Sequence, residues 1–394
     1  MDKFFFYKIL LLAFSMHIFG AVMGISATEP VFMGADRMNE IKKIIKNKRV
    51  GLIANQTSLM LDGTHLLDAL IAEDIHVVKI FAPEHGFRGK EEAGAMVNNS
   101  KDSKTGLTIV SIYGNNTKPT RSQLAGIDLI IFDMQDVGAR FYTYISTMHY
   151  AMEACAENKV EFMVLDRPNP NDFIDGPILK KTHTSFVGVH PIPVLHGLTV
   201  GELARMINGE GWIKTGKNSC KLHIVKMKNW SHGDPYQLPV KPSPNLPNDQ
   251  AIRLYPSLCF FEGTIISVGR GTTFPFQVLG GPDEKYGTFY FSPRPIAGMD
   301  SNPMHRGVVC YGIDLRDSVF EGGLSLRFVI DFYNRSGQNE KIFFTRPNWF
   351  DLLAGTDVLR LQIINGLSED EIRRSWEKDL EEYKKMRRKY LIYN

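Results

Sequence analysis

Four consecutive residues, Pro83, Glu84, His85 and Gly86, place a carboxyl group next to an imidazole directly after an apolar stretch of the chain. The proline ends that stretch and the glycine permits a tight turn, so we expect both side chains at an open strand end. A partly desolvated carboxyl group in such a place can have a raised pKa and act as a general acid. The alternative is that Glu84 caps the next helix or pairs with Arg88.

Further carboxyl groups follow other apolar stretches. Asp133 and Asp136 could provide a second catalytic carboxylate, although residues 136–138 are equally typical of a turn that leads into a helix. Asp166 begins a stiff, proline-containing turn, where it either contacts a ligand or pairs with the adjacent arginine. The candidate ligand-binding residues at these strand ends are Asn55, His85, Arg88, Gln135, Arg140, Tyr142, Asp166, Asn169 and His196.

Arg270 lies between two glycines, an arrangement that suits a carboxylate clamp and equally suits a hairpin turn. Its loop is neither a P-loop nor a GxGxxG fingerprint, because the lysine and the glycine spacing are missing. HExxH and GxSxG motifs are also absent from the sequence, and the histidines lack the spacing of metal ligands. We therefore expect neither a nucleotide cofactor nor a metal.

Short apolar runs alternate with helix-like segments and would position these residues. The runs are rich in Val, Ile, Leu or Phe without strict alternation, which is typical of strands buried on both faces of a parallel sheet. Capping boxes, Thr120 with Gln123 and Thr199 with Glu202, mark two helix starts. The expected strands are 49–54, 76–82, 107–113, 127–133, 161–166 and 191–195, and the expected helices are 39–47, 64–73, a short one after Thr120, 144–157 and one from Thr199 to 209 or 211.

This alternation predicts an α/β fold, with a Rossmann-like domain and a parallel sheet over residues 28–240. In such a sheet ligands bind outside the carboxyl ends of the strands, where five of the apolar runs end in polar residues. Prolines and glycines become frequent after residue 241, and we interpret 241–394 as a smaller α+β domain. Its expected elements are a strand at 308–314, helices at 323–334 and 347–353, and a long charged helix from Ser368 to about 389.

The composition is that of an ordinary globular protein. Of 394 residues, 43% are hydrophobic and 23% are charged, which excludes a disordered, collagen-like or coiled-coil chain. The net charge is +3 and basic residues form no block, so a nucleic-acid-binding protein is not expected. Four cysteines are too few for a disulfide scaffold, and Cys155 in its alanine-rich segment is expected to be a buried thiol.

Residues 1–27 are predicted to be a signal peptide. Two lysines precede an almost wholly apolar segment at 9–23, and small residues follow as far as Ala27. This order is typical of a secretory signal cleaved after Ser26 or Ala27, with an uncleaved anchor as the alternative. Because no cysteine lies near this site, a lipoprotein is not expected. We expect an exported, periplasmic protein without stable membrane insertion after cleavage.

Several longer stretches carry a family resemblance. They are 83–89 (PEHGFRG), 132–144 (FDMQDVGARFYTY), 165–170 (LDRPNP), 176–177 (GP), 186–188 (FVG), 196–197 (HG), 243–245 (SPN), 262–264 (EGT), 269–273 (GRGTT) and 389–393 (KYLIY). In these stretches the chain resembles the bacterial exo-β-N-acetylmuramidases, peptidoglycan-recycling glycoside hydrolases formerly described only as a domain of unknown function. The resemblance covers nearly the whole chain after the predicted signal peptide.

The resemblance implies an activity and a site. Enzymes of this family remove single N-acetylmuramic acid residues from the non-reducing ends of peptidoglycan fragments, so saccharides or muropeptides from peptidoglycan are the implied partners. The resemblance also implies a Rossmann-like N-terminal domain, a smaller C-terminal domain and a site in the cleft between them. It implies that Glu84 is the catalytic residue.

Glycoside hydrolysis requires an acid for the leaving oxygen and a second group for water or a nucleophile. We expect Glu84 to be the acid and Asp133 or Asp136 to be the second carboxylate. Alternatively, the 2-acetamido group of the substrate is the nucleophile, and a carboxylate or Tyr142 orients it. Muramic acid also carries a lactyl carboxylate, which calls for a cation, best an arginine. The candidate cations are Arg88, Arg140 and Arg270.

Two other functions are compatible with parts of this pattern. A non-catalytic periplasmic protein that binds muropeptides or sugars would also use two domains and a polar crevice. An esterase or amidase acting on wall fragments is less compatible, because the serine motif and the metal ligands are missing. Turnover of a chromogenic β-N-acetylmuraminide distinguishes all three.

Overall fold

The computed structural model describes residues 29–88, 100–216 and 219–394. The predicted signal peptide at 1–27 and the last residue of the 83–89 stretch lie outside the described residues. Within the described part of the chain, no helix combines the length and the apolar character needed to cross a membrane.

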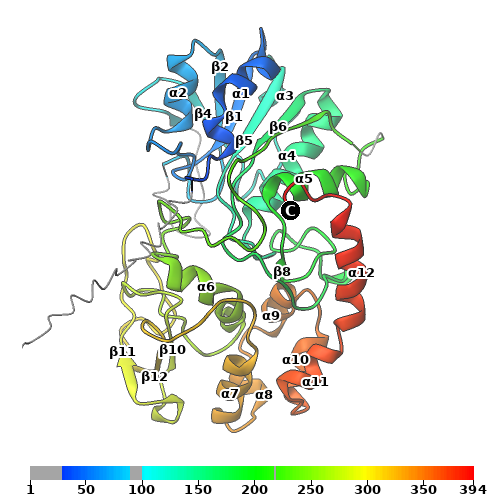
Figure 1. Ribbon diagram of the computed structural model, residues 1–394. Coiled ribbons are helices and arrows are strands. Elements are labelled where there is room, and N and C mark those ends of the chain that lie inside the picture. Colours follow the sequence, from blue (N-terminus) through cyan, green and yellow to red (C-terminus); the bar gives the residue numbers. More distant parts are fainter. Residues whose placement is uncertain (1–28, 89–99, 217–218) are drawn as a thin grey trace, which may run out of the picture. The chain divides into compact units, whose positions relative to one another are not determined.

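A seven-stranded sheet, in the order β3-β4-β2-β1-β5-β6-β9, forms the centre of the N-terminal region (Figure 1). Six strands are parallel to their neighbours, and β3 pairs antiparallel with β4 at one edge. The strands are β1 (Val50–Ala54), β2 (Val77–Ala82), β3 (Ser100–Lys101), β4 (Thr108–Ser111), β5 (Leu129–Asp133), β6 (Glu161–Leu165) and β9 (Leu222–Val225). The predicted α/β fold with a parallel sheet is confirmed.

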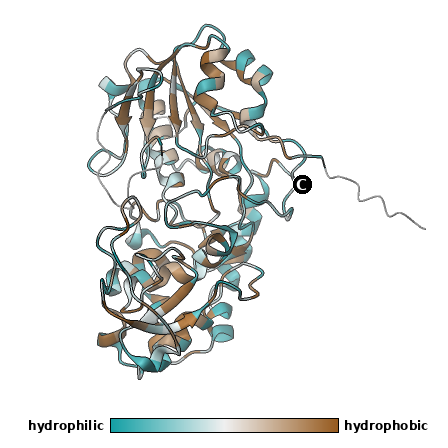
Figure 2. Cartoon of the chain, turned by 90° about the vertical axis from the view of Figure 1, so that its left-hand side faces the viewer, coloured by the Kyte–Doolittle hydropathy of each residue, from teal (hydrophilic) through white to brown (hydrophobic). Residues whose placement is uncertain are grey.

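Helices cover both faces of this sheet (Figure 1). In β5, Ile130 and Phe132 belong to the buried cluster that contains residues of α4 (Tyr144–Asn158) and α5 (Val200–Gly209). Leu129 and Ile131, which point to the opposite face, belong to the cluster with α1 (Met38–Ile45) and α2 (Leu66–Ala72). Burial on both sides explains why these strands are continuously apolar in sequence, and Figure 2 shows the resulting hydrophobic strands.

The two helix starts predicted from capping boxes are confirmed. Thr120 caps the short α3 (Arg121–Leu124), and Thr199 caps α5, each with the reciprocal bond from the third helical residue. Ser368 forms the same capping box before α11 (Glu369–Arg374). In each case the hydroxyl accepts a backbone N–H that the helix leaves without a partner.

The chain after residue 241 adds a small antiparallel sheet and several helices. The sheet has the order β10-β12-β11, which places β12 between the other two strands. The elements are α6 (Asp249–Leu258), η3 (Cys259–Gly263), β10 (Val278–Gly281), η4 (Glu284–Tyr286), β11 (Phe289–Phe291), β12 (Cys310–Asp314), α7 (Arg327–Arg335), α8 (Glu340–Phe343), α9 (Pro347–Ala354), α10 (Val358–Ile364), α11 and α12 (Glu377–Arg388).

Two expectations about the elements were wrong, and the helix α6 was missed. Residues 191–195 are not a strand of the large sheet: β8 (Leu195–His196) pairs antiparallel with β7 (Ile174–Asp175), and β9 is the sixth parallel strand. Pro191 and Pro193 lack the N–H groups that a central strand needs. The helix expected from Ser368 to about 389 is divided into α11 and α12, and α6 was not expected, because Pro256 interrupts its pattern.

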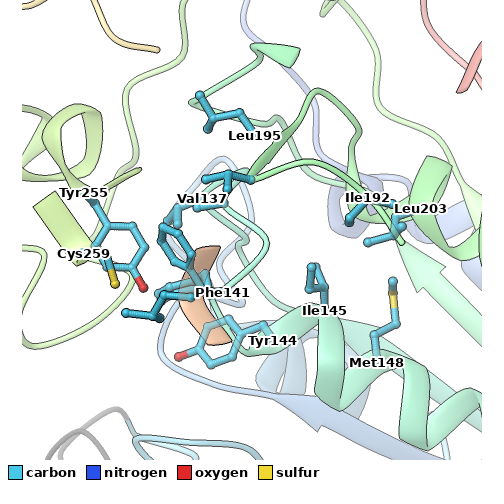
Figure 3. Packing of buried hydrophobic residues seen from close by; sticks show 14 of the residues in the cluster. Val137, Phe141, Tyr144, Ile145, Met148, Ile192, Leu195, Leu203, Tyr255 and Cys259 are labelled. Carbon is cyan, nitrogen blue, oxygen red and sulfur yellow. The ribbon is translucent and has the colours of Figure 1, made fainter. Parts of the chain in front are cut away.

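One hydrophobic cluster extends from the large sheet into the later part of the chain. Phe141 packs edge to face against Tyr255 and Phe260, with ring centroids 5.3 Å and 5.8 Å apart. Figure 3 shows Phe141 beside Tyr255 and Cys259, with α4 below them. All four cysteines are buried and free, as expected for Cys155. The predicted domain boundary between residues 240 and 241 stays a prediction.

Candidate active site

A cavity of about 530 Å³ contains the Glu84 carboxyl group. Its size lies within the range of roughly 300–1,000 Å³ that is usual for small-molecule sites. Both the N-terminal region and the chain after residue 241 contribute to its wall. The lining residues with polar groups are Glu84, His85, Tyr113, Tyr142, Thr143, Tyr144, Ser185, Ser243, Asn245, Tyr255, Glu262, Arg270, Asp300, Arg346 and Trp349, and the other aromatic residues are Phe141, Phe186 and Phe276.

Two hydroxyl groups hold the carboxyl group of Glu84. Tyr113, which follows β4, donates from its hydroxyl to Oε1 at 2.8 Å, and Thr143, at the start of α4, donates to Oε2 at 2.6 Å. Burial and the neighbouring Glu84 carboxylate raise the pKa of Tyr113 well above its usual value, so this hydroxyl stays a donor. Contacts to both oxygens fix the plane of the carboxyl group at the cavity wall.

The turn after β2 aims Glu84. The N–H of Gly86 donates to the carbonyl of Pro83 at 3.0 Å, and His85 adopts a left-handed backbone with φ of +68°. Phe276, another residue on the cavity wall, is also left-handed, with φ of +56°. Such backbones cost about 1–3 kcal/mol in residues other than glycine and gather at functional sites. Strained geometry at two separate points of one cavity favours a functional role for it.

Arg270 lines the cavity, as predicted, but a neighbouring carboxylate engages it. Its Nε and Nη2 donate to Oε1 of Glu262 at 3.0 Å and 2.7 Å. The guanidinium also lies over the Phe276 ring, 5.1 Å from the centroid. Burial alone would lower the pKa of Arg270, but the Glu262 carboxylate raises it above its usual value. The pair is therefore close to neutral as a unit.

Tyr142 and Tyr144 form another part of the wall. Both hydroxyls donate to the carbonyl of Pro242, at 2.9 Å and 3.3 Å, and the two rings pack edge to face with centroids 4.8 Å apart. These bonds join the start of α4 to the chain that enters the C-terminal region. The predicted site residue Tyr142 is thus at the cavity, with its hydroxyl already occupied by a backbone carbonyl.

Asp133 is not on the wall of this cavity. It is 0% exposed and forms a bidentate ion pair with Arg167, which is 2% exposed, at Nε–Oδ1 2.6 Å and Nη2–Oδ2 2.9 Å. Asp136 is also buried, where it accepts a bond from the Gly138 N–H at 2.7 Å and contacts His196 at 3.5 Å. Their position does not support the expected role as second carboxylate, because neither lines the space beside Glu84.

The other predicted residues at the strand ends are tied into the interior. Asn55 accepts from Thr57, Gln135 donates to the carbonyls of Asp136 and Pro168, and Asn169 donates to the carbonyl of Leu198. His196 accepts from the N–H of Leu198. Asp166 accepts from the hydroxyls of Thr199 and Tyr393, and burial and Glu202 raise its pKa to about 7. These residues are bonded to other groups of the protein interior, and none lines the cavity that contains Glu84.

Two predicted arginines do not reach the cavity wall. Arg140 is fully buried and donates to the backbone carbonyls of Pro177, Ile192 and Leu353. Burial lowers the pKa of Arg140 to about 9, because the protein interior disfavours the charged guanidinium. Arg88 is exposed, pairs with Asp102 at 2.6 Å and lies over the Phe87 ring. Neither position supports contact with a ligand beside Glu84.

Sequence reasoning overlooked several residues of the site. Tyr113 follows the end of β4, so the strand-end rule applied to that strand as well would have found it. Thr143 precedes α4 and was overlooked, because a lone hydroxyl at a helix start is typical of a capping residue. Arg346 and Trp349 lie at the start of α9, and nothing in the sequence distinguishes them from surface residues.

Another cavity, of about 640 Å³, lies on a different part of the molecule. Its wall is rich in carboxyl groups, those of Asp172, Asp234, Asp249 and Glu321, with Arg253 as the arginine. Within the described ranges, no cluster of three or more His, Cys, Asp or Glu side chains has the arrangement of a metal site. The cavity with Glu84 combines a fixed carboxyl group, aromatic walls and arginines, which suits hydrolysis of a sugar derivative.

Comparisons with known proteins identify the family of this chain. Residues 50–250 match the family model described as exo-β-N-acetylmuramidase NamZ, N-terminal, and residues 253–393 match the corresponding C-terminal model. The chain is 42% identical over 379 residues to the peptidoglycan β-N-acetylmuramidase NamZ of Bacillus subtilis (strain 168), covering 90% of this chain and 89% of the relative.

Solved structures with the same fold come from Bacteroides fragilis NCTC 9343. One DUF1343 family protein is 44% identical with a TM-score of 0.85, covering 93% of this chain and 99% of its own. Another is 30% identical with a TM-score of 0.80, covering 92% and 99%. The family resemblance in the sequence is thus confirmed over both parts of the chain. The chain belongs to the NamZ family of exo-β-N-acetylmuramidases.

Proposed function

We propose that this chain is an exo-acting glycoside hydrolase that releases N-acetylmuramic acid from the non-reducing ends of peptidoglycan fragments, with Glu84 as its general acid. Membership of the NamZ family and the named activity of the Bacillus subtilis relative support the reaction. The observation that carries the role of Glu84 is its carboxyl group, fixed at the wall of the cavity by the hydroxyls of Tyr113 and Thr143.

These two hydroxyls suit the acid step. When the carboxyl group of Glu84 gives its proton to the glycosidic oxygen, a carboxylate remains, and its two oxygens accept the bonds from Tyr113 and Thr143. Hydrogen bonds to an ionised acceptor are about twice as strong as neutral ones. The hydroxyls therefore stabilise the state that forms as the leaving sugar departs.

We propose that the oxygen of the substrate's own 2-acetamido group attacks the anomeric carbon while the glycosidic bond breaks and Glu84 protonates the leaving oxygen. Water then attacks the same carbon, opens the cyclised intermediate and gives its proton to the Glu84 carboxylate. Asp133 and Asp136 do not line the cavity, and Glu262 is occupied by Arg270. Asp300 remains as a lining carboxylate, with one oxygen accepting the N–H of Asn302 at 3.0 Å. Substrate assistance requires no nucleophile from the enzyme and is an established exception to the two-carboxylate mechanism.

Two experiments together test the identity of the nucleophile: inhibition by a thiazoline analogue of muramic acid, which resembles the cyclised acetamido group, and turnover by Asp300→Asn. Tight competitive inhibition and a variant with nearly normal turnover would support substrate assistance. Weak inhibition, together with loss of turnover in Asp300→Asn, would instead identify Asp300 as the second carboxylate.

The direct test of the function is release of sugar from a synthetic MurNAc-β-GlcNAc disaccharide by the wild-type chain and by Glu84→Gln. Release by the wild type and its loss in the variant is the expected result. Release by both would retain the activity but reject Glu84 as the acid. Binding of the disaccharide without release by either would favour a non-catalytic sugar-binding protein.

We also propose that the chain is exported through the segment at 1–27 and acts in the periplasm. A basic start, an apolar segment and small residues up to Ala27 support this proposal. Expression of the full chain followed by fractionation and N-terminal sequencing tests it. A chain that begins at Ala27 or Thr28 in the periplasmic fraction is expected, whereas an uncleaved chain in the membrane fraction would indicate an anchor.

A further inference from the structure

We propose that Arg346 binds the lactyl carboxylate of N-acetylmuramic acid and thereby selects this sugar over N-acetylglucosamine. The inference rests on the proposed function, because it concerns the sugar that occupies the cavity beside Glu84. These two sugars differ only in the 3-O-lactyl ether of muramic acid, which carries one negative charge near neutral pH. Selectivity between them therefore requires a group that recognises that carboxylate.

The cavity needs a cation that is not already neutralised. Glu84 and Asp300 line it and would repel an anionic sugar when ionised. Arg270 is held by Glu262, so that pair adds little net charge. An additional positive charge is required to bind a carboxylate in such surroundings.

Arg346 meets this requirement. It lies on the cavity wall directly before α9, its side chain is exposed, and no ion pair with a carboxylate is found for it within the described part of the chain. Its guanidinium carbon lies over the ring of Trp349, 5.2 Å from the centroid. A contact with an aromatic face does not consume the N–H groups of the guanidinium, so they remain able to bind a carboxylate through two parallel bonds.

Trp349 offers a second donor at the same place. Its indole ring lines the cavity, and among the described residues its Nε1–H has no acceptor. An indole N–H usually finds a partner when it is buried. A ligand oxygen bound between Arg346 and this ring would provide that partner. Two donors three residues apart thus favour an anionic group of the ligand at this part of the wall.

The test compares three substrates that share a chromogenic leaving group: the β-N-acetylmuraminide, its lactyl methyl ester and the β-N-acetylglucosaminide. For Arg346→Gln we expect kcat/KM on the muraminide to fall by about 10- to 100-fold, the effect of one lost bond to a charged group. The ester and the glucosaminide, which have no carboxylate, should be hydrolysed as by the wild type. Arg346→Lys should restore part of the lost activity, because it returns the charge without the fork.

Arg253→Gln is the matched control, since Arg253 is an exposed arginine on the wall of the other cavity. It should leave all three substrates unchanged. Equal losses on the three substrates in Arg346→Gln would overturn the proposal, because they would mean a general effect on the site. Unchanged selectivity for the muraminide would overturn it as well.

Failure of the proposed function gives a different result. If the wild-type chain hydrolyses none of the three substrates, the function is rejected, and calorimetric binding of free N-acetylmuramic acid then tests Arg346 by itself. Binding that weakens at least tenfold in Arg346→Gln and remains in Arg253→Gln would support the carboxylate contact. Equal binding by both variants, or no binding by the wild type, would reject it.

Discussion

Replacement of Glu84 by Gln removes the proton of the proposed acid while nearly preserving the size of the side chain. The amide oxygen can still accept a bond from Tyr113 or Thr143, and the hydroxyl that meets the NH2 group can rotate to accept from it. The fold around the carboxyl group should therefore persist. General acid catalysis contributes about 10²–10⁴-fold, or roughly 3–5 kcal/mol of transition-state stabilisation, and we expect a loss of this size.

Comparison of leaving groups makes the experiment specific for the acid. The sugar alkoxide that leaves from MurNAc-β-GlcNAc needs a proton, whereas a nitrophenolate is stable enough to leave without one. In Glu84→Gln, kcat/KM on the disaccharide should therefore fall by the full factor of about 10²–10⁴. The fall in kcat/KM on the nitrophenyl glycoside should be smaller by at least about tenfold. Tyr113→Phe keeps the acid but removes one bond to its carboxylate form, so a loss of about 10- to 100-fold is expected.

Initial rates at low substrate concentration, measured as kcat/KM, provide the comparison for each substrate. Glu321→Gln is a suitable control, because Glu321 lines the other cavity and should have wild-type rates. Equal losses on both substrates in Glu84→Gln, or a loss below about tenfold on the disaccharide, would refute the assignment of the acid. An unchanged thermal unfolding midpoint would exclude misfolding as the cause of any loss.

Three other substitutions test the interior beneath the site. Asp133→Asn should lower the free energy of unfolding in urea by about 3–5 kcal/mol, since it leaves Arg167 buried without its counter-charge, but folded protein should keep its turnover number. Gly138→Ala should destabilise by at least about 1–3 kcal/mol, because φ is +78° and a Cβ would lie 2.1 Å from Oδ1 of Asn169. Asp166 keeps its proton in the folded state up to about pH 7 but in the unfolded state only up to about pH 4, so stability falls as pH rises between these values. In the wild type this fall in the free energy of unfolding amounts to at most about 4 kcal/mol. Asp166→Asn should abolish it, as measured by urea titrations repeated from pH 4 to 8.

The large sheet could be predicted from the sequence because burial on two faces leaves a direct pattern. Continuous apolar runs such as that of β5 and capping residues such as Thr199 are local signals, and they identified five of the six parallel strands and most of the helices that cover them. β9 was missed because its residues, LHIV, include a histidine that pairs with Glu161. In the small sheet of the C-terminal region β12 lies within the expected strand at 308–314, but β10 and β11 lacked such signals, since β10 is half glycine and β11 has three residues.

The candidate site was only partly predictable, because a polar residue at a strand end has the same appearance in sequence whether it faces a ligand or another residue. Glu84, His85, Tyr142 and Arg270 do line the cavity. Asp133, by contrast, is neutralised by Arg167, which lies 34 positions along the chain, and only the fold brings the two together. Arg346 was missed although it lines the cavity, because segments that are distant in the sequence build that cavity.

The ion pair of Asp133 and Arg167 also explains where the site lies in the sheet. β1 and β5 are neighbours at the point where the strand order reverses, and ligands of open α/β sheets usually bind beyond the carboxyl ends at that point. Here the internal pair and the amides of Asn55 and Gln135 fill that position. The reactive carboxyl group instead follows β2, where the chain after residue 241 supplies the opposite wall and its arginines.

If this reasoning is correct, removing the pair in an Asp133→Leu, Arg167→Met double variant should cost much less stability than either single change and should leave hydrolysis beside Glu84 intact. A stable double variant without activity would show that the pair takes part in the reaction after all.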